Sequence, residues 1–284
     1  MVGKSVLITG CSTGVGRATA ERLARGDFLV YASARRPEVL DELAQLGCKT
    51  LALDVTEDSS MVEAVRQIVD TCGAVDVLVN NAGLGEYSSV EEAPIESLRR
   101  QLETNVVGLT RLIQLVLPHM RARGWGRIVN VGSMSGKVTL PSTAFYSASK
   151  YAVEALTDAL RFEVRPFGIG VSLIEPGAIK TGFDEAAIGP LSEASDSSPY
   201  DRFNRSAAKA MVGSSGLARS PEDVAHVVES AIRARKPKSR YRVGLDARLM
   251  LGARKVLSDR VLDRMLRSQF KPPAPAAQAG AAAP

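Results

Sequence analysis

Residues Ser5–Gly16 read SVLITGCSTGVG, and this stretch decides how the rest of the chain is interpreted. The apolar run at its start is typical of a buried β-strand, and an amphipathic helical stretch, Arg17–Arg25, follows the glycines. A glycine-rich turn between a strand and a helix lets the backbone approach a pyrophosphate, to which the helix N-terminus presents free N–H groups. A glycine pattern alone is a weak signal, but this one has the strand–turn–helix context that supports it. The stretch therefore predicts the first unit of a dinucleotide-binding fold.

The alternation of strand and helix patterns continues along most of the chain. The predicted strands lie at residues 5–9, 28–32, 50–53, 75–79, 127–131 and 169–174. The further amphipathic stretches that predict helices lie at 61–71, 98–123 and 147–165. Strands that are almost continuously apolar are typical of parallel sheets covered on both faces. We therefore expect an α/β fold over residues 1–245, with a single Rossmann-type, doubly wound parallel sheet flanked by helices on both faces.

The composition excludes several classes of protein. With 284 residues, of which 45% are hydrophobic and 24% charged, and a mean hydropathy of +0.00, the chain is neither collagen-like nor wholly disordered. Three cysteines without a zinc-binding spacing and only two histidines lead us to expect no metal site and no Ser-His-Asp triad. No run of about 18 apolar residues is present to span a membrane. Because no charged and then apolar leader follows Met1, we expect a cytoplasmic protein in a reducing compartment.

The net charge of +5 comes from one part of the chain. Residues 231–271 hold 13 basic and 3 acidic residues, whereas the remainder is slightly acidic. The high isoelectric point therefore describes one segment, and no nucleic-acid-binding motif with interleaved aromatic residues is present. We expect no nucleic-acid partner.

Within this basic segment, residues 246–271 predict one basic amphipathic C-terminal helix. Such a helix can lie on an anionic membrane surface, which would make the protein peripheral at a membrane. It can also pack against the substrate pocket or a neighbouring subunit, and we favour this alternative. Residues 272–284 contain only Pro, Ala, Gly and Gln and predict a disordered tail.

Residues 182–220 interrupt the alternation of strands and helices. They are rich in Ser, Ala, Gly and Asp and have a weak periodic pattern. Because they follow a strand at whose carboxyl end ligands bind in open α/β sheets, we favour a lid over a tolerated surface insertion. Its large apolar residues, which either line a pocket or pack the lid on the core, are Phe183, Ile188, Leu191 and Phe203. Ser220 followed by Pro221 is typical of the start of the next helix.

Further motifs follow the predicted strands or lie on the predicted helices, Asn105 in the middle of one helix and Tyr146 to Lys150 on another. In chain order they are Asn80-Asn81-Ala82-Gly83, Asn105, Ser133, Tyr146-Ser-Ala-Ser-Lys150, and Pro176-Gly177 followed by Thr181. With the Thr-Gly-x-x-x-Gly-x-Gly spacing of the first turn, they resemble in type and order the motifs of the short-chain dehydrogenase/reductase family. The resemblance covers about residues 4–245 and is nearest to the hydroxysteroid and retinol dehydrogenase-like branch.

The resemblance implies a catalytic set that interconverts a carbonyl and an alcohol by hydride transfer. In it, Tyr146 is the general acid in reduction and the base in oxidation, and Lys150 lowers its pKa and binds the nicotinamide ribose. Ser133, or its neighbour Ser135, hydrogen-bonds the substrate oxygen, and Asn105 holds a water in the proton relay. A tyrosine alone is a poor acid–base group at neutral pH, since its pKa is about 10. A lysine four residues later lies on the same helix face, and its charge favours the phenolate.

The resemblance also implies a preference for NADP(H). By alignment with the family, Ala34 occupies the position at the end of the second strand where NAD enzymes have an acid, and Arg35 follows it. A guanidinium offers forked donors to a 2′-phosphate. The alternative is that Arg35 and Arg36 solvate the start of the next helix, and Asp54 could equally be a turn residue. The residues implied to bind the cofactor are Gly10, Ser12, Thr13, Gly14, Val15, Gly16, Arg35, Asp54, Val55, Asn81, Ala82, Gly83, Tyr146, Lys150, Pro176, Gly177, Ile179 and Thr181.

We expect the substrate to be a lipophilic ketone, aldehyde or secondary alcohol, steroid- or retinoid-like. The alternatives are an acyl-thioester or xenobiotic carbonyl reductase, a catalytically silent NADP-binding regulator, and a scaffold that acts through the basic C-terminus. The complete catalytic set argues against a regulator. Because family members commonly associate through the helices at 98–123 and 146–165, we expect a homodimer or homotetramer, although these helices could serve the sheet alone.

Overall fold

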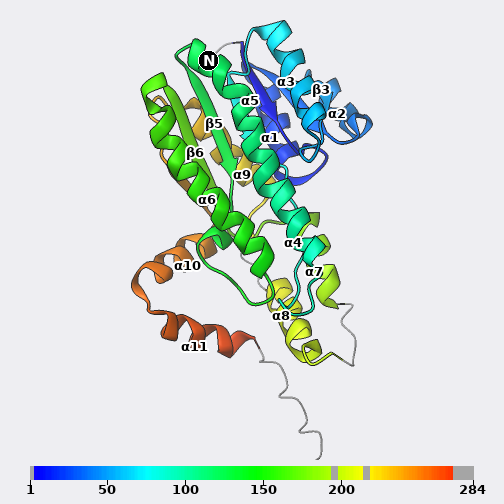
Figure 1. Cartoon of the computed structure of the whole chain (residues 1–284), viewed down its shortest axis with the longest axis vertical. Helices are drawn as coiled ribbons and strands as arrows, with labels where there is room; N and C mark the ends of the chain where they lie inside the picture. The colour runs from blue at the N-terminus through cyan, green and yellow to red at the C-terminus, as the bar shows by residue number, and fades with distance from the viewer. Residues whose placement is uncertain (1–2, 193–197, 214–217, 271–284) are drawn as a thin grey trace, which may run out of the picture.

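A parallel sheet of seven strands forms the centre of the described part of the chain (Figure 1). The structure is a computed structural model that describes residues 3–192, 198–213 and 218–270. The strands are β1 (Lys4–Ile8), β2 (Phe28–Ala34), β3 (Lys49–Ala52), β4 (Val77–Asn80), β5 (Gly126–Val131), β6 (Ile169–Pro176) and β7 (Arg240–Val243). They lie in the order β3-β2-β1-β4-β5-β6-β7, and all neighbours are parallel. The predicted doubly wound sheet is confirmed.

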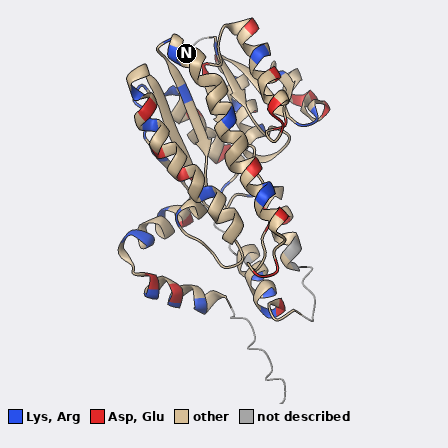
Figure 2. Ribbon diagram, viewed as in Figure 1, with Lys and Arg blue, Asp and Glu red and all other residues tan. Residues whose placement is uncertain are grey.

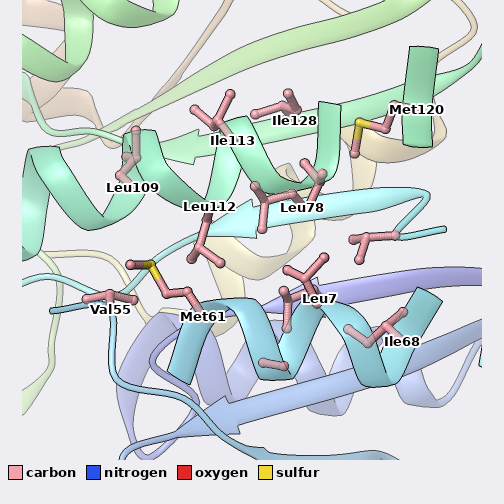
Figure 3. Packing of buried hydrophobic residues seen from close by; sticks show 14 of the residues in the cluster. Leu7, Val55, Met61, Ile68, Leu78, Leu109, Leu112, Ile113, Met120 and Ile128 are labelled. Carbon is pink, nitrogen blue, oxygen red and sulfur yellow. The ribbon is translucent and has the colours of Figure 1, made fainter. Parts of the chain in front are cut away.

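Helices cover both faces of this sheet. They are α1 (Gly14–Ala24), α2 (Asp41–Gln45), α3 (Asp58–Cys72), α4 (Ile95–Leu102), α5 (Leu109–Ala122), α6 (Ala144–Val164), α7 (Gly182–Ser192), α8 (Asp201–Gly213), α9 (Pro221–Arg233), α10 (Leu245–Val256) and α11 (Asp259–Gln269). Successive residues of a strand point to opposite faces. Leu7, Leu78 and Ile128 therefore pack with α3, α5 and α6 (Figure 3), whereas Val6 and Ile8 pack with α1, α2 and α9. Burial on both faces explains why the strand sequences are almost continuously apolar.

The sequence did not predict the edge strand β7. It reads Arg-Tyr-Arg-Val, with two arginines where a covered strand has apolar residues. Both arginines face carboxylates: the Nε atoms of Arg240 and Arg242 lie 3.6 and 3.5 Å from the carboxylate oxygens of Glu175 on β6. Arg240 also pairs with Glu154 of α6 at 2.7 Å. The strand is therefore held by ion pairs as well as by its backbone pairing with β6.

The helix predicted at 98–123 is continuous but changes its winding. Between α4 and α5 the chain forms a π-helical segment, Glu103–Gly108. Gly108 packs closely against the loop after β3, since a Cβ there would lie 2.1 Å from the carbonyl oxygen of Val55. The π-helical segment carries Asn105, whose side chain hydrogen-bonds the backbone of Leu84 after β4. Such segments are frequent at functional sites.

The segment predicted as a lid contains the helices α7 and α8 within its described residues. A β-bridge between Ile179 and Arg219 joins its two ends. The helix α9 begins as predicted: the Ser220 hydroxyl accepts a hydrogen bond from the backbone N–H of Asp223 at 3.2 Å, and Pro221 is the first helical residue. The lid is therefore anchored at its base by regular structure.

The basic C-terminal segment forms two helices, which corrects the prediction of a single helix at 246–271. α10 and α11 are separated because Leu257 adopts an extended backbone, with φ −93° and ψ 139°. Leu251, Leu262 and Phe270 are buried, so both helices pack on the protein. Figure 1 shows α10 leaving the end of the sheet and α11 running back toward α8.

The surface of this segment is not uniformly basic. The ribbon of α11 carries both acidic and basic positions (Figure 2), and an ion pair of 2.5 Å between Arg254 and Asp259 joins the two helices. Among the described residues, no helix has both the length and the apolar character needed to cross a bilayer. The predicted tail at 272–284 lies outside the described residues.

Two buried glutamates lie where α6, β6 and β7 meet. Glu175 has no exposed surface. The Glu154 carboxylate accepts hydrogen bonds from Arg240 and forms an ion pair of 3.0 Å with Lys137. Burial is the main cause that raises the pKa of Glu175 to about 7, and the neighbouring Glu154 raises it further. The charges of Arg240 and Lys137 act in the opposite direction but are weaker. Because Glu175 directly precedes Pro176, this cluster supports one wall of the site described below.

The raised pKa of Glu175 predicts that stability depends on pH. Its pKa is about 7 in the folded chain and 4.5 as an ordinary glutamate, so its contribution is present below about pH 4.5 and is lost as the pH rises through 7. Glu175→Gln cannot ionise. Relative to this variant, we expect the free energy of unfolding of the wild type to fall by about 2–3 kcal/mol over this range, measured by urea denaturation. Glu163→Gln, at an exposed position of α6, is the control and should show no such difference; equal pH profiles for all three proteins would contradict the prediction.

Candidate active site

The carboxyl ends of the strands surround a cavity of about 630 Å³. It lies between β1 and β4, where the strand order reverses and where ligands bind in open α/β sheets. All the residues predicted to bind the cofactor line this cavity, except Gly16. So do Ser133, Tyr146 and Lys150 of the predicted catalytic set. The structure therefore brings together residues that are far apart in the sequence.

The glycine-rich turn is tied to the loop after β4. The Thr9 hydroxyl oxygen accepts hydrogen bonds from the backbone N–H groups of Asn81 at 3.0 Å and Ala82 at 2.9 Å. The Asn81 side chain donates to the carbonyl oxygens of Thr9 and Gly10, at 2.9 and 3.1 Å. At the start of α1, the side chain of Thr13 makes no capping hydrogen bond. The first N–H groups of this helix therefore face the cavity without a side-chain cap, which suits an anionic pyrophosphate.

Gly16 lies behind the cavity and lets α1 approach the turn. A Cβ at this position would lie 2.3 Å from the carbonyl oxygen of Gly10 and 2.4 Å from the Nδ2 of Asn81. No side chain can occupy this space unless the turn or the helix moves. The sequence therefore predicted a residue that shapes the binding turn, although it does not itself line the cavity.

We expect Gly16→Ala to separate α1 from the turn and so to weaken dinucleotide binding by about tenfold or more. The steric conflict should also lower the free energy of unfolding by about 1–3 kcal/mol. Nucleotide titration followed by fluorescence and denaturant unfolding measure the two effects. Gly252→Ala is the matched control, because a Cβ there meets no atom within 4 Å. The assignment fails if Gly16→Ala binds nucleotide as well as the control does.

Arg35 and Asp54 lie at the end of the cavity beside β2 and β3. Arg35 lines the cavity and forms no ion pair or side-chain hydrogen bond with another described residue, whereas its neighbour Arg36 does not line it. Ala34, at the position where NAD enzymes have an acid, is buried. Asp54 lines the cavity and also accepts hydrogen bonds from the N–H and hydroxyl groups of Thr56, at 2.9 and 2.7 Å. Asp54 is therefore a turn residue whose position also borders the cavity.

Tyr146 and Lys150 face the cavity from one side of α6. The Lys150 Nζ lies 5.7 Å from the centre of the Tyr146 ring and donates a hydrogen bond of 3.0 Å to the carbonyl oxygen of Val131, the last residue of β5. Ser133 follows the same strand, and its hydroxyl oxygen accepts a hydrogen bond from the backbone N–H of Ser135 at 3.1 Å. The end of β5 therefore positions both Lys150 and Ser133. Ser135 also lines the cavity.

Burial alters the pKa of both ionisable groups. It raises the pKa of Tyr146 to about 12, against the hydrogen bond with Ser133, and the charge of Asp184 adds to the increase. It lowers the pKa of Lys150 to about 8. In the protein without its cofactor, burial therefore outweighs the lowering of the Tyr146 pKa that was expected from Lys150. At neutral pH the tyrosine carries its proton and can donate it.

Asn105 does not line the cavity but supports it from behind. Its Nδ2 donates to the carbonyl oxygen of Leu84 and to the hydroxyl of Ser149, and its Oδ1 accepts from the Leu84 N–H, all at 2.9 Å. The Ser149 hydroxyl in turn donates to the Tyr146 carbonyl oxygen at 2.7 Å. Asn105 therefore connects the loop after β4 to the catalytic helix.

The part of the cavity beyond Tyr146 is mostly apolar. The rings of Tyr87 and Phe183 are both centred 5.7 Å from the Tyr146 ring. Of the lid residues predicted to line a pocket, Phe183 and Ile188 do so, whereas Leu191 and Phe203 pack elsewhere in the lid. The lid is therefore both a pocket wall and a packed layer.

Sequence reasoning missed several residues of this part of the site. They are Tyr87, Leu140, Thr143, Asp184 and Met211, which line the cavity, and Phe270, which packs in the same cluster as Tyr146. They come from loops, the lid and the C-terminal helix, where no periodic pattern identifies an inward-facing position. Only Tyr87, an aromatic residue in the loop after a predicted strand, offered a sequence signal that could have indicated a place in the cavity.

Residues 4–188 match the family described as short chain dehydrogenase. The chain belongs to the short-chain dehydrogenase/reductase family. It is 41% identical over 251 residues to 17-beta-hydroxysteroid dehydrogenase type 1 of Homo sapiens. The aligned region covers 83% of this chain and 76% of that relative. It is also 41% identical over 180 residues to 3-ketodihydrosphingosine reductase of Bacteroides thetaiotaomicron, covering 63% of this chain and 65% of that relative. A solved short-chain dehydrogenase/reductase from Burkholderia phymatum in complex with NAD has a TM-score of 0.76 at 26% identity and covers 97% of this chain and 98% of its own.

Membership in the short-chain dehydrogenase/reductase family makes this protein an oxidoreductase that uses a nicotinamide cofactor. The similarity to a hydroxysteroid dehydrogenase supports the branch expected from the sequence. The site fits such a cofactor on its own geometry: the Gly10 and Gly16 positions admit no side chain, and the first turn of α1 is uncapped.

Proposed function

We propose that this short-chain dehydrogenase/reductase interconverts a carbonyl and an alcohol with NADP(H), acting on a lipophilic ketone, aldehyde or secondary alcohol, steroid- or retinoid-like. The observation that carries the proposal is the position of Tyr146. Its protonated phenol stands between the dinucleotide turn and the apolar wall, beside Ser133 and Lys150. A protein that only bound the cofactor would need no proton donor at this boundary.

The bound cofactor supplies the hydride. In reduction, Tyr146 donates its proton to the substrate oxygen. The Ser133 hydroxyl hydrogen-bonds the same oxygen and stabilises the negative charge that develops there. With the cofactor bound, Lys150 would hold the nicotinamide ribose, and its ammonium would stabilise the phenolate that remains. Asn105, which lies behind the cavity wall, would hold a water of the proton relay through the acceptor site of its Oδ1 that the Leu84 N–H leaves free.

Tyr146→Phe tests this assignment with almost no change in volume. We expect the rate of carbonyl reduction to fall by about 10²–10⁴-fold, the usual contribution of a positioned acid, while NADPH affinity stays within a few-fold. NADPH consumption and nucleotide titration measure the two quantities. A variant that keeps more than about a tenth of the wild-type rate would show that another group donates the proton.

The choice of NADP(H) rests on Arg35. Its guanidinium lines the cavity without an ion-pair partner among the described residues, and Ala34 supplies no acid to bind a ribose 2′-hydroxyl. A 2′-phosphate would pair with this guanidinium.

We expect Arg35→Ala to weaken NADPH binding by about 1.5–3 kcal/mol, because one charge-assisted interaction is lost, and to leave NADH binding almost unchanged. Arg36→Ala is the matched control, since this neighbouring arginine does not line the cavity. Parallel titrations with NADPH and NADH provide the measurement. Equal weakening of both cofactors would make Arg35 a structural residue.

The lipophilic substrate class is supported by the wall beyond Tyr146. Phe183 and Ile188 line the cavity there, and Phe270 of the C-terminal segment packs in the same cluster. The relatives include proteins named for a hydroxysteroid and for 3-ketodihydrosphingosine. A panel of ketosteroids, retinal, acetoacetyl thioesters and quinones, followed with NADPH and NADH, tests the class. Preferred reduction of the thioester or the quinones would favour the alternative reductases, and no turnover with any member would favour the silent regulator.

The same packing favours the interpretation that the C-terminal helices pack beside the substrate pocket and do not lie on a membrane. Leu262 and Phe270 are buried on the apolar face of α11, where a membrane-bound helix would expose them. We also propose a homodimer or homotetramer. On α6, the side of the helix away from the sheet exposes Tyr151 and Phe162, at 42% and 65%, which a second copy would cover.

A further inference from the structure

A carboxylate lies in the substrate part of the cavity, and carbonyl reduction as described gives it no role. Asp184 is in the first turn of α7 and lines the same cavity as Tyr146. The preceding residue, Phe183, places its ring 5.7 Å from the Tyr146 ring, which brings this turn of α7 against the catalytic tyrosine. In agreement with this position, the charge of Asp184 raises the pKa of both Tyr146 and Tyr87.

Asp184 has no cationic partner among the described residues. Burial raises its pKa, and no arginine, lysine or histidine opposes that increase. The cations of the cavity are elsewhere: Lys150 is bound to the Val131 carbonyl, and Arg35 lies at the opposite end beside β2. An apolar substrate that filled the cavity would remove water from this carboxylate without replacing its hydrogen bonds, which is unfavourable.

The carboxylate also opposes the reduction of a neutral ketone. Negative charge develops on the substrate oxygen beside Tyr146, and the nearby charge of Asp184 repels it. A positive group on the substrate, between its carbonyl and Asp184, would cancel this repulsion and would give the carboxylate its missing partner.

We propose that Asp184 binds a protonated amine next to the reacting carbonyl, so that the substrate is an amino ketone with an apolar chain. The inference rests on the proposed carbonyl reduction. It keeps the lipophilic ketone as the substrate but departs from the neutral steroid- or retinoid-like examples. The carbonyl carbon gains a hydride and its oxygen gains the Tyr146 proton, while NADPH is oxidised to NADP⁺. The ammonium keeps its protons, and the product is an amino alcohol whose chain lies against Phe183 and Ile188.

The test compares 2-aminodecan-3-one with its N-acetyl derivative and with decan-3-one, using NADPH at a pH at which the amine is protonated. We expect the wild-type kcat/KM for the amino ketone to exceed that for the N-acetyl derivative by about ten- to a hundredfold, as one charge-assisted hydrogen bond provides. Asp184→Asn keeps the shape of the side chain but removes its charge. It should abolish the preference for the amine and raise kcat/KM for decan-3-one.

Glu185→Gln is the matched control. Glu185 is the next residue in the same helical turn, but it is exposed and does not line the cavity. Its substitution removes the same charge from the helix N-terminus and should leave the preference for the amine in place. Unchanged thermal unfolding of Asp184→Asn verifies that this variant is folded.

Calorimetric binding of 2-aminodecan-3-ol and its N-acetyl derivative to the protein loaded with NADP⁺ gives a readout that needs no turnover. The amino alcohol should bind about tenfold or more tightly, and Asp184→Asn should lose this difference. If the wild type reduces the neutral ketones as well as the amino ketone, or if Asp184→Asn keeps the preference, the amine site is wrong and carbonyl reduction stands. If no ketone is reduced but the amino alcohol binds through Asp184, the proposed function fails and the amine site stands. Absence of both effects rejects both.

Discussion

The site depends on hydrogen bonds that hold two diverging loops together where the sheet reverses its order. The connections after β1 and β4 lead to opposite faces of the sheet, which opens the crevice between them. Thr9 and Asn81 join these loops at the floor of the crevice. The chain after Asn81 leads to Leu84, from which hydrogen bonds run through Asn105 and Ser149 to the backbone of α6. The glycine-rich turn and the helix that carries Tyr146 are therefore positioned by connected polar contacts.

The helix α6 performs several tasks with residues that are four positions apart. Tyr146, Lys150, Glu154 and Asp158 follow each other along one side of the helix, and the last two are bound by Arg240 of β7. Tyr146 and Lys150 are thereby continued by an acidic pair that attaches the helix to the edge of the sheet. Because Tyr146, Lys150 and Glu154 are buried, each is sensitive to the charge of its neighbours. The same helix face fixes the geometry of the site and its electrostatic environment.

The sequence alone was sufficient for the strands β1 to β6 and for the glycine-rich turn, because these depend on local patterns. Most of the cavity residues that it named came from the resemblance to a known family. A buried strand is apolar, a turn that approaches phosphate needs glycine, and a Tyr–Lys pair at helical spacing shares one face. It was insufficient for β7, whose arginines are explained by Glu154 and Glu175, residues distant in sequence. It was likewise insufficient for the break at Leu257 and for Tyr87 and Phe270, whose inward positions are set by tertiary packing. The raised pKa of Tyr146 is also a property of burial, which a motif does not contain.

The place of Phe270 has a consequence for how the enzyme is made. A chain emerges from the ribosome in order, and its domains fold as units from the N-terminus during synthesis. The dinucleotide crevice between β1 and β4 uses strands from the first third of the chain, whereas the cluster around Tyr146 also needs a residue from the last described helix. The nucleotide half of the fold can therefore assemble while the apolar cluster around Tyr146 still lacks Phe270. The packing around Tyr146 is complete only after the chain beyond α11 has been made.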